Sequence, residues 1–199
     1  ASMNIAERFN IYTAIHKGLR AYMCEVLVQV GRMDPDDADE VRTAVDAVRG
    51  LVEISRGHVQ HEDEWIHTAL EARRPGSSAA TQADHHHHLG TFELLEGSLR
   101  DLERSTGAGR AAAARLLYRQ LALFVAENFE HMHVEETDNH ATLVTCYSEQ
   151  EVLELNARPG LAIQMANRRG LRPALERVQA LPRVPTTAEE RAAFAMGEG

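Results

Sequence analysis

The chain has little cysteine, no long apolar run and no excess of positive charge. Its two cysteines, Cys24 and Cys146, form no CxxC motif and are too few for a disulfide framework, so they indicate neither a disulfide-stapled domain nor a redox centre. No stretch approaches the roughly 20 apolar residues that a membrane span needs. No basic-then-apolar signal pattern opens the sequence either, and we therefore expect a cytoplasmic protein.

The charge balance is acidic. Acidic residues outnumber lysine and arginine by 30 to 21, which gives a formal net charge of −9, and the basic residues form no clustered stripe. This argues against nucleic acid and against an anionic membrane surface as partners, whereas a bound cation suits the balance. A length of 199 residues allows one domain with a sizeable core and a small appendage.

The hydrophobic pattern predicts an all-α fold, because apolar residues recur at intervals of three and four positions. No segment shows a sustained alternation of apolar and polar residues. Turn signals divide the pattern into four long helices, which we expect over about residues 4–30, 37–73, 81–102 and 110–145. A capping box at Thr81 and Asp84 should open the third. Short loops between long helices predict an up-down-up-down antiparallel four-helix bundle over residues 4–147. Capping boxes at Ser148 and Thr187 predict a helical C-terminal extension over residues 148–199.

One metal-ligand spacing occurs twice, as His58-x-x-x-Glu62 and His131-x-x-x-Glu135. Residues four apart on an α-helix lie one above the other, so each pair can direct an imidazole and a carboxylate at one centre. His16 and His85 lie on the two other long helices, and in an antiparallel bundle all four segments meet at the same end. Together they form an oxygen-and-nitrogen ligand set suited to a pair of non-haem iron ions.

The remaining histidines are expected to play lesser parts. In the run of four that begins at His85, only His85 and His88 continue the apolar stripe, so His86 and His87 should face solvent. Tyr12, one turn before His16, is either a core aromatic or a hydrogen-bond donor of the metal pocket. Four further histidines lie off the inward stripe and are expected at the surface or rim, namely His61, His67, His133 and His140.

These motifs resemble the signature of the hemerythrin-like, or HHE cation-binding, proteins of bacteria. That signature has a histidine on the first helix, His-x-x-x-Glu on the second, one or two histidines on the third, and His-x-x-x-Glu or a close variant on the fourth. The matching segments here are residues 15–20, 58–63, 84–88 and 131–136, and the similarity covers about residues 5–147. The resemblance implies a carboxylate-bridged di-iron centre in the bundle core, with Glu62 and Glu135 as bridges and the histidines as terminal ligands. Two iron ions joined by an oxo or hydroxo group are the implied cofactor, with zinc or manganese as substitutes.

The chain departs from the oxygen-carrying hemerythrins at two positions. Those proteins place two histidines four apart on the third helix, but Leu89 stands four after His85, so only His88 remains as a seventh ligand. They also carry the fourth-helix carboxylate five positions after its histidine, which would select Glu136. The spacing of four favours Glu135, because it lies directly over His131.

We therefore expect a protein that binds or senses O₂, NO, peroxide or iron, whose partner is a small diatomic or peroxide ligand. Carriers, sensors and low-turnover peroxidases need the same residues, so enzymatic activity is left open, as is assembly into a homodimer. One alternative is an enzyme resembling the DinB-type thiol transferases, which hold one divalent metal with three histidines. The other is a structural interaction module in which metal staples the bundle.

Overall fold

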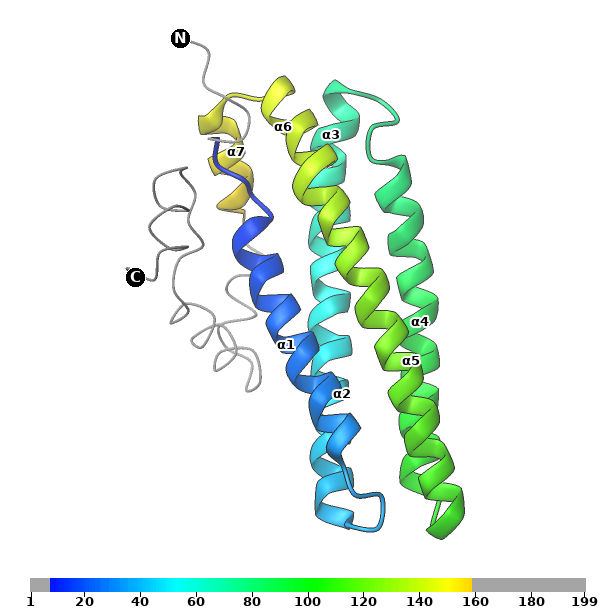
Figure 1. Ribbon diagram of the computed structural model, residues 1–199. Coiled ribbons are helices and arrows are strands. Elements are labelled where there is room, and N and C mark those ends of the chain that lie inside the picture. The colour runs from blue at the N-terminus through cyan, green and yellow to red at the C-terminus, as the bar shows by residue number, and fades with distance from the viewer. Residues whose placement is uncertain (1–7, 159–199) are drawn as a thin grey trace, which may run out of the picture.

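The computed structural model describes residues 8–158, and every regular element within them is a helix (Figure 1). The prediction of an all-α chain is confirmed for this part. The elements in order are α1 (Thr13–Arg32), α2 (Ala38–His61), η2 (Glu62–His67), α3 (Thr68–Arg73), α4 (Ala79–Arg104), α5 (Gly107–Val134), η3 (Glu135–Asn139), α6 (His140–Cys146) and α7 (Glu149–Asn156).

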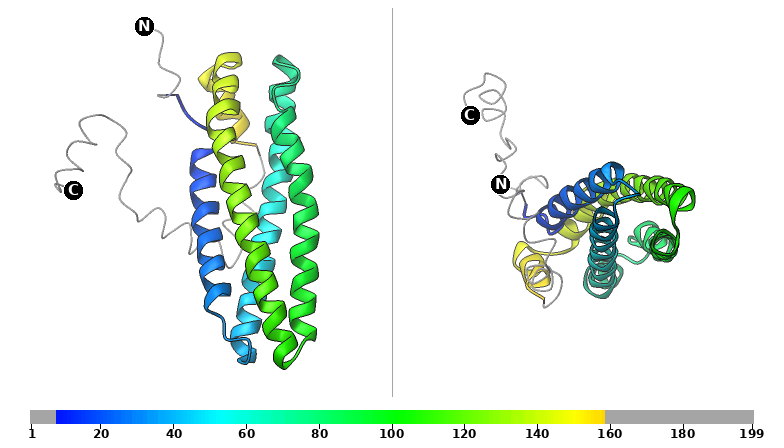
Figure 2. Two further views of the ribbon diagram at one scale, coloured as in Figure 1. Left: turned by 45° about the vertical axis from the view of Figure 1, so that its right-hand side comes forward. Right: turned by 90° about the horizontal axis from the view of Figure 1, so that it is seen from below.

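Four long helical stretches lie side by side (Figures 1 and 2). α1 and α4 each form one stretch, α2 continues through η2 into α3, and α5 continues through η3 into α6. α1 contacts α2 and α5, and α4 contacts the same two helices, so the four stretches close into a ring. The buried side chains between them include Leu19, Met23, Val48, Leu51, Phe92, Leu95, Leu117, Leu121 and Phe124. This apolar core fills the middle of the bundle.

Two π-helical segments interrupt the long stretches, and each begins at the glutamate of a His-x-x-x-Glu motif. η2 begins at Glu62 and η3 at Glu135. In a π-helix each backbone N–H bonds to the carbonyl five residues earlier, so the turn is wider and a residue five positions on lies nearer to the face of the first than it does in an α-helix. Such segments are rare and are frequently found at functional sites.

α1 begins at Thr13, not near residue 4 as the sequence predicted, and residues 4–7 lie outside the described range. The N-terminal cap is Tyr12, whose backbone N–H donates to Asn10 Oδ1 at 3.1 Å. The Asn10 amide in turn donates to the backbone carbonyl of Glu136 at 3.0 Å. These contacts tie the segment before α1 to η3, so the chain does not extend the helix there.

α4 begins before Thr81, which lies buried inside the helix, so the predicted capping box at that residue is wrong. The carboxylate of Glu71 accepts hydrogen bonds from the hydroxyl and backbone N–H of Ser78, at 2.6 and 3.0 Å. It also accepts from the backbone N–H of Gly76 at 2.6 Å. A side chain of the preceding helix therefore fixes this turn, and the residues around Thr81 carry no sign of it.

The capping box at Ser148 is confirmed, with the Ser148 and Glu151 side chains each bonded to the other's backbone N–H. α7 then places Val152 against Ile11, Leu70 and Leu143, which closes one end of the apolar interior. The predicted capping box at Thr187 lies outside the described residues. None of the helices within residues 8–158 combines the length and apolar character that crossing a membrane requires.

The Glu71 turn makes a first prediction. Hydrogen bonds from the Ser78 hydroxyl and then from the backbone of Gly76 and Ser78 lower the pKa of Glu71 from 4.5 to about 2. A depressed carboxyl pKa stabilises the fold above the unfolded value, and this contribution disappears as pH falls from 4.5 towards 2. Glu71→Gln should therefore destabilise the chelated protein at pH 6, and the difference from wild type should shrink at low pH.

Urea unfolding at a series of pH values measures this difference. Glu130→Gln, at an exposed glutamate of α5, is the matched control and should change the free energy of unfolding little at any pH. A Glu71→Gln penalty that stays constant down to pH 2 would contradict the carboxylate cap.

Candidate metal centre

Four helical stretches bring six buried ligand residues together in two groups that share both glutamates. The first group contains His16, His58, Glu62 and Glu135, and the second contains Glu62, His85, His131 and Glu135. Within each group the potential ligand atoms all lie within 4.8 Å of one another. α1 supplies His16 and α4 supplies His85, while the two His-x-x-x-Glu motifs supply the rest.

The first group has the dimensions of a single cation site. His16 Nε2 lies 3.2 Å from His58 Nε2 and 3.4 Å from Glu135 Oε2. His58 Nε2 lies 3.3 Å from Glu62 Oε1. Two ligands about 2.1 Å from a shared ion, at tetrahedral or octahedral angles, are about 3.0–3.4 Å apart. The observed separations fall in or near this range, so these four side chains fit one ion.

The second group lies on the other side of the same carboxylates. His85 Nε2 is 3.0 Å from His131 Nε2 and 3.4 Å from Glu62 Oε2. His131 Nε2 is 3.3 Å from Glu135 Oε2, and Glu135 Oε1 is 3.7 Å from His85 Nε2. Glu62 thus directs Oε1 at the first group and Oε2 at the second. This is the arrangement in which a carboxylate can bridge two cations.

Three of the four histidines direct their other ring nitrogen at an outer carboxylate. The Nδ1–oxygen distances are 3.1 Å from His16 to Glu136, 2.7 Å from His85 to Asp63 and 3.2 Å from His131 to Asp84. When Nδ1–H donates to a carboxylate, the tautomer is fixed and the lone pair of Nε2 faces the centre. The carboxylates thereby orient the imidazoles as metal ligands.

Two of these outer carboxylates occupy equivalent places in the sequence, since Asp63 directly follows Glu62 and Glu136 directly follows Glu135. Each motif glutamate lies inside, and the acidic residue after it holds a histidine of another helix. Arg20 fixes Glu136 with two hydrogen bonds, at 2.6 and 3.2 Å. The sequence offered Glu135 and Glu136 as alternative carboxylate ligands. In the structure Glu135 lies in both groups, and Glu136 lies outside them.

The glutamates would be costly to bury without a cation. All four carboxylate oxygens of Glu62 and Glu135 are buried and have no hydrogen-bond partner. The same holds for Nδ1 of His58. An unpaired buried polar group costs roughly 1–3 kcal/mol on mutational scales, and a charged group costs more. A typical domain is stable by only about 5–15 kcal/mol. The donor set therefore fits bound metal, which would give these oxygens positive partners.

Protonation follows the same geometry. Burial opposes the charging of His16 and His85, but the carboxylates of Glu136 and Glu62 around His16, and of Glu62 and Asp63 around His85, raise both pKa values to about 9. Burial lowers the pKa of His58 to about 4. Burial also opposes the ionisation of Glu62, yet His58 and His16 hold its pKa well below the ordinary value.

His88, the seventh predicted ligand, is not brought into either group. It is buried, its ring centroid lies 5.0 Å from that of His131, and its Nδ1 has no partner. Burial, and then the proximity of His131 and His85, lower its pKa to about 4. His86 and His87 are exposed.

The expectation that His67 and His140 lie at the surface or rim is wrong, because both are buried. His67 follows Glu62 by five residues, and His140 follows Glu135 by five. A helix with a constant period of 3.6 turns both away from the glutamates, whereas the wider turns of the π-helical segments bring positions five apart closer to one face. The repeated spacing Glu-x-x-x-x-His was the only sign of this in the sequence.

Tyr12 lies beside the first group. Its ring centroid is 5.3 Å from that of His16, the residue is fully buried, and its hydroxyl has no hydrogen-bond partner. Burial, and then the charges of Glu135 and Glu62, raise its pKa well above the ordinary value. Tyr12 therefore keeps its proton and offers a donor next to the centre.

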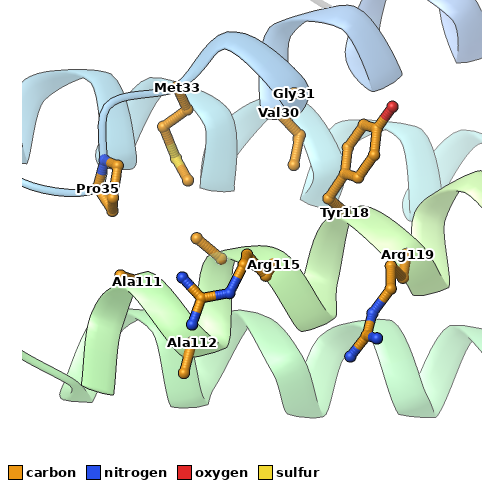
Figure 3. A pocket seen from close by; sticks show the side chains of 10 residues that line it. Val30, Gly31, Met33, Pro35, Ala111, Ala112, Arg115, Tyr118 and Arg119 are labelled. Carbon is orange, nitrogen blue, oxygen red and sulfur yellow. The ribbon is translucent and has the colours of Figure 1, made fainter. Parts of the chain in front are cut away.

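A separate surface pocket lies where the end of α1 faces the first half of α5 (Figure 3). Val30, Met33 and Tyr118 form apolar parts of its wall, and Arg115 and Arg119 line it as well. Its lining residues include no histidine, cysteine or acidic side chain. The pocket therefore shares neither residues nor ligand chemistry with the metal centre.

The histidine pKa values predict how the metal-free protein responds to pH. The raised pKa values of His16 and His85 contribute stability that is fully present below the unfolded value of 6.5. This contribution is lost as pH rises through about 9. The lowered pKa values of His58 and His88 contribute stability that is fully present above 6.5. This contribution is lost as pH falls through about 4. The chelated protein should be most stable near neutral pH.

We expect each of these histidines to contribute on the order of 3 kcal/mol across its window, because each pKa differs from 6.5 by about 2.5 units. Chemical unfolding at pH 5, 6.5 and 9 with a strong chelator present checks this. His58→Ala should flatten the acidic side of the profile, and stability that rises steadily from pH 6.5 to 9 would contradict the raised pKa values.

A comparison with protein families agrees with this geometry. The model for the hemerythrin HHE cation-binding domain matches residues 8–143, a range that contains all six residues of the two groups. Comparisons with curated proteins and with solved structures give no match. Because the family model covers more than half of the 199 residues, the chain belongs to the hemerythrin HHE cation-binding domain family.

Proposed function

We propose that the protein binds two iron ions as a carboxylate-bridged pair and uses them to bind or sense a small molecule such as O₂, NO or peroxide. The observation that carries the proposal is the position of Glu62, whose two oxygens face two different groups of histidines. Glu135 is shared between the same groups. A site for one metal would need only one of them.

The donor chemistry favours iron among the common metals. Both groups offer imidazole nitrogen and carboxylate oxygen, and neither contains a cysteine. Histidine and carboxylate sets with open positions are typical of non-haem iron, whereas soft thiolates favour zinc or copper(I). Zinc and manganese accept the same ligands and are alternative occupants.

The protein residues bind and orient the pair and exclude water from it. Each group supplies four protein ligands, fewer than octahedral coordination needs, so positions remain for a small ligand. When bound, the pair of iron ions would supply the redox chemistry and the affinity for diatomic molecules or peroxide. Tyr12 contributes a protonated hydroxyl beside His16, and its burial helps to keep bulk solvent out.

The proposal includes the bundle topology of the hemerythrins, an up-down-up-down antiparallel arrangement of four helices. It is supported by the closed ring of contacts among α1, α2, α4 and α5. The mononuclear thiol-transferase alternative is less compatible with the site, because four histidines and two shared carboxylates exceed what one ion with three histidines uses. A purely structural metal would need no open positions.

Metal analysis tests the proposal directly. Protein expressed in iron-replete medium and purified without chelator should contain close to two irons per chain. Reaction of the anaerobically reduced protein with O₂, NO or peroxide should change its absorption spectrum. One zinc ion per chain with no iron, and no spectral response, would contradict the di-iron proposal.

The two neighbouring glutamates provide a further prediction. Glu135→Ala removes a ligand shared by both groups and should abolish binding of at least one ion. Glu136→Ala removes only the partner of His16 Nδ1 and of Arg20, and losing such an orienting group weakens metal binding by about 10–100-fold. Iron content and chelator competition of the two variants measure this, and a greater loss from Glu136→Ala would show that the bridge is assigned to the wrong residue.

A further inference from the structure

We infer that His67 is a fifth histidine ligand of the centre and binds the same cation as His85 and His131. The inference rests on the proposed two-metal function. His67 follows His58 and Glu62 along one helical stretch, so that stretch would supply three ligands instead of two.

His67 shares two carboxylate contacts with His85 and forms a third cluster with His85 and Asp63, next to the second group. Nδ1 of His67 lies 2.9 Å from Asp63 Oδ1, and Nδ1 of His85 lies 2.7 Å from the same oxygen. Nε2 of His67 lies 3.8 Å from Glu135 Oε1, and Nε2 of His85 lies 3.7 Å from it. The two rings are stacked, with centroids 4.8 Å apart and an angle of 25° between their planes. Asp63 therefore presents two parallel imidazoles to the same edge of Glu135.

The hydrogen bonds around His67 leave its inner nitrogen available. With Nδ1–H donating to Asp63, Nε2 of the neutral ring carries a lone pair. Thr81 Oγ1 lies 3.2 Å from it, but this hydroxyl has one hydrogen and also lies 3.1 Å from the carbonyl of Ser78. The amide of Asn139 donates to the same Thr81 oxygen at 3.1 Å. When the hydroxyl donates to Ser78, the lone pair on Nε2 has no protein donor.

Burial and local backbone structure support the same role. His67 is 0% exposed, and buried polar side chains rarely leave a polar atom without a partner; a cation would be that partner for Nε2 when the Thr81 hydroxyl donates to Ser78. η2 places it there, because a continuous α-helix would turn a residue five positions after Glu62 away from the centre. The irregular backbone is therefore explained by a ligand that it brings inward.

The two ions would then have unequal surroundings. One would be held by His16 and His58, and the other by His67, His85 and His131, with both glutamates shared. An extra imidazole should make the second position the tighter one. The protein should accordingly fill its two positions in sequence during a metal titration.

Anaerobic titration of the full-length metal-free chain with ferrous iron tests the inference. His67→Ala and the polar variant His67→Gln should each weaken one of the two binding steps by at least the loss typical of an orienting group, about 10–100-fold, and leave the other unchanged. X-ray absorption of the iron-loaded His67 variants should show one fewer imidazole per two irons than that of the wild-type protein. Circular dichroism of the metal-free variants confirms that they fold.

Two matched controls separate ligation from packing. Thr81→Val keeps the shape of the side chain and removes the hydroxyl beside Nε2, and His88→Ala removes a buried histidine that has no carboxylate partner. Both should retain the wild-type affinity and imidazole count. Thr81→Val behaving like His67→Ala would instead assign His67 a packing role.

The outcomes also separate this inference from the proposed function. Wild-type protein that binds two irons, with both His67 variants binding equally well and showing the same imidazole count, would overturn the role of His67 alone. Wild-type protein that binds fewer than two metal ions would overturn the di-iron proposal, and this inference with it.

Discussion

The repulsion between two buried carboxylates is the constraint on which the rest of the structure depends. Glu62 and Glu135 are 1% and 0% exposed, and neither has a hydrogen-bond donor of its own. Burial and then the charge of Glu62 act to raise the pKa of Glu135. The opposing effect of His131 and His67 is larger, so the pKa of Glu135 lies below its ordinary value. Two anions in a medium of low dielectric constant are stable together only if positive charge lies between or around them.

The surrounding residues supply that charge in layers. Imidazoles encircle the two glutamates, and a second ring of carboxylates, Asp63, Asp84 and Glu136, lies outside the imidazoles. Arg20 then neutralises Glu136 at the outer edge. Burial opposes the ionisation of Glu136, but its hydrogen bonds with His16 and Arg20 lower its pKa to about 2. The alternation of sign from the inside outwards lets so many titratable groups lie in one end of a helical bundle, while the apolar core fills the middle.

The sequence predicted the elements and the inward faces where a regular helix continues, and failed where a contact distant in the chain changes the backbone. His58 and His131 were placed correctly on buried faces, because a period of 3.6 holds up to each motif glutamate. His67 is the last residue of η2, and no local pattern specifies that the backbone hydrogen bonds of this segment run to the fifth preceding residue instead of the fourth. The start of α4 failed for a similar reason, since Glu71 caps a turn seven residues ahead of it.

The two halves of the site also show that one local unit was used twice with different results. In each half a histidine and a glutamate four residues later face inward, an acidic residue follows, and a π-helical segment begins. In the first half the acidic residue, Asp63, holds His85 and His67 together; in the second, Glu136 holds His16 and is shared with Arg20. The second contact of Glu136 therefore comes from an arginine of α1 and not from a histidine of its own stretch. The local sequence unit therefore places both shared glutamates at the centre, and its outer carboxylate orients different partners on the two sides.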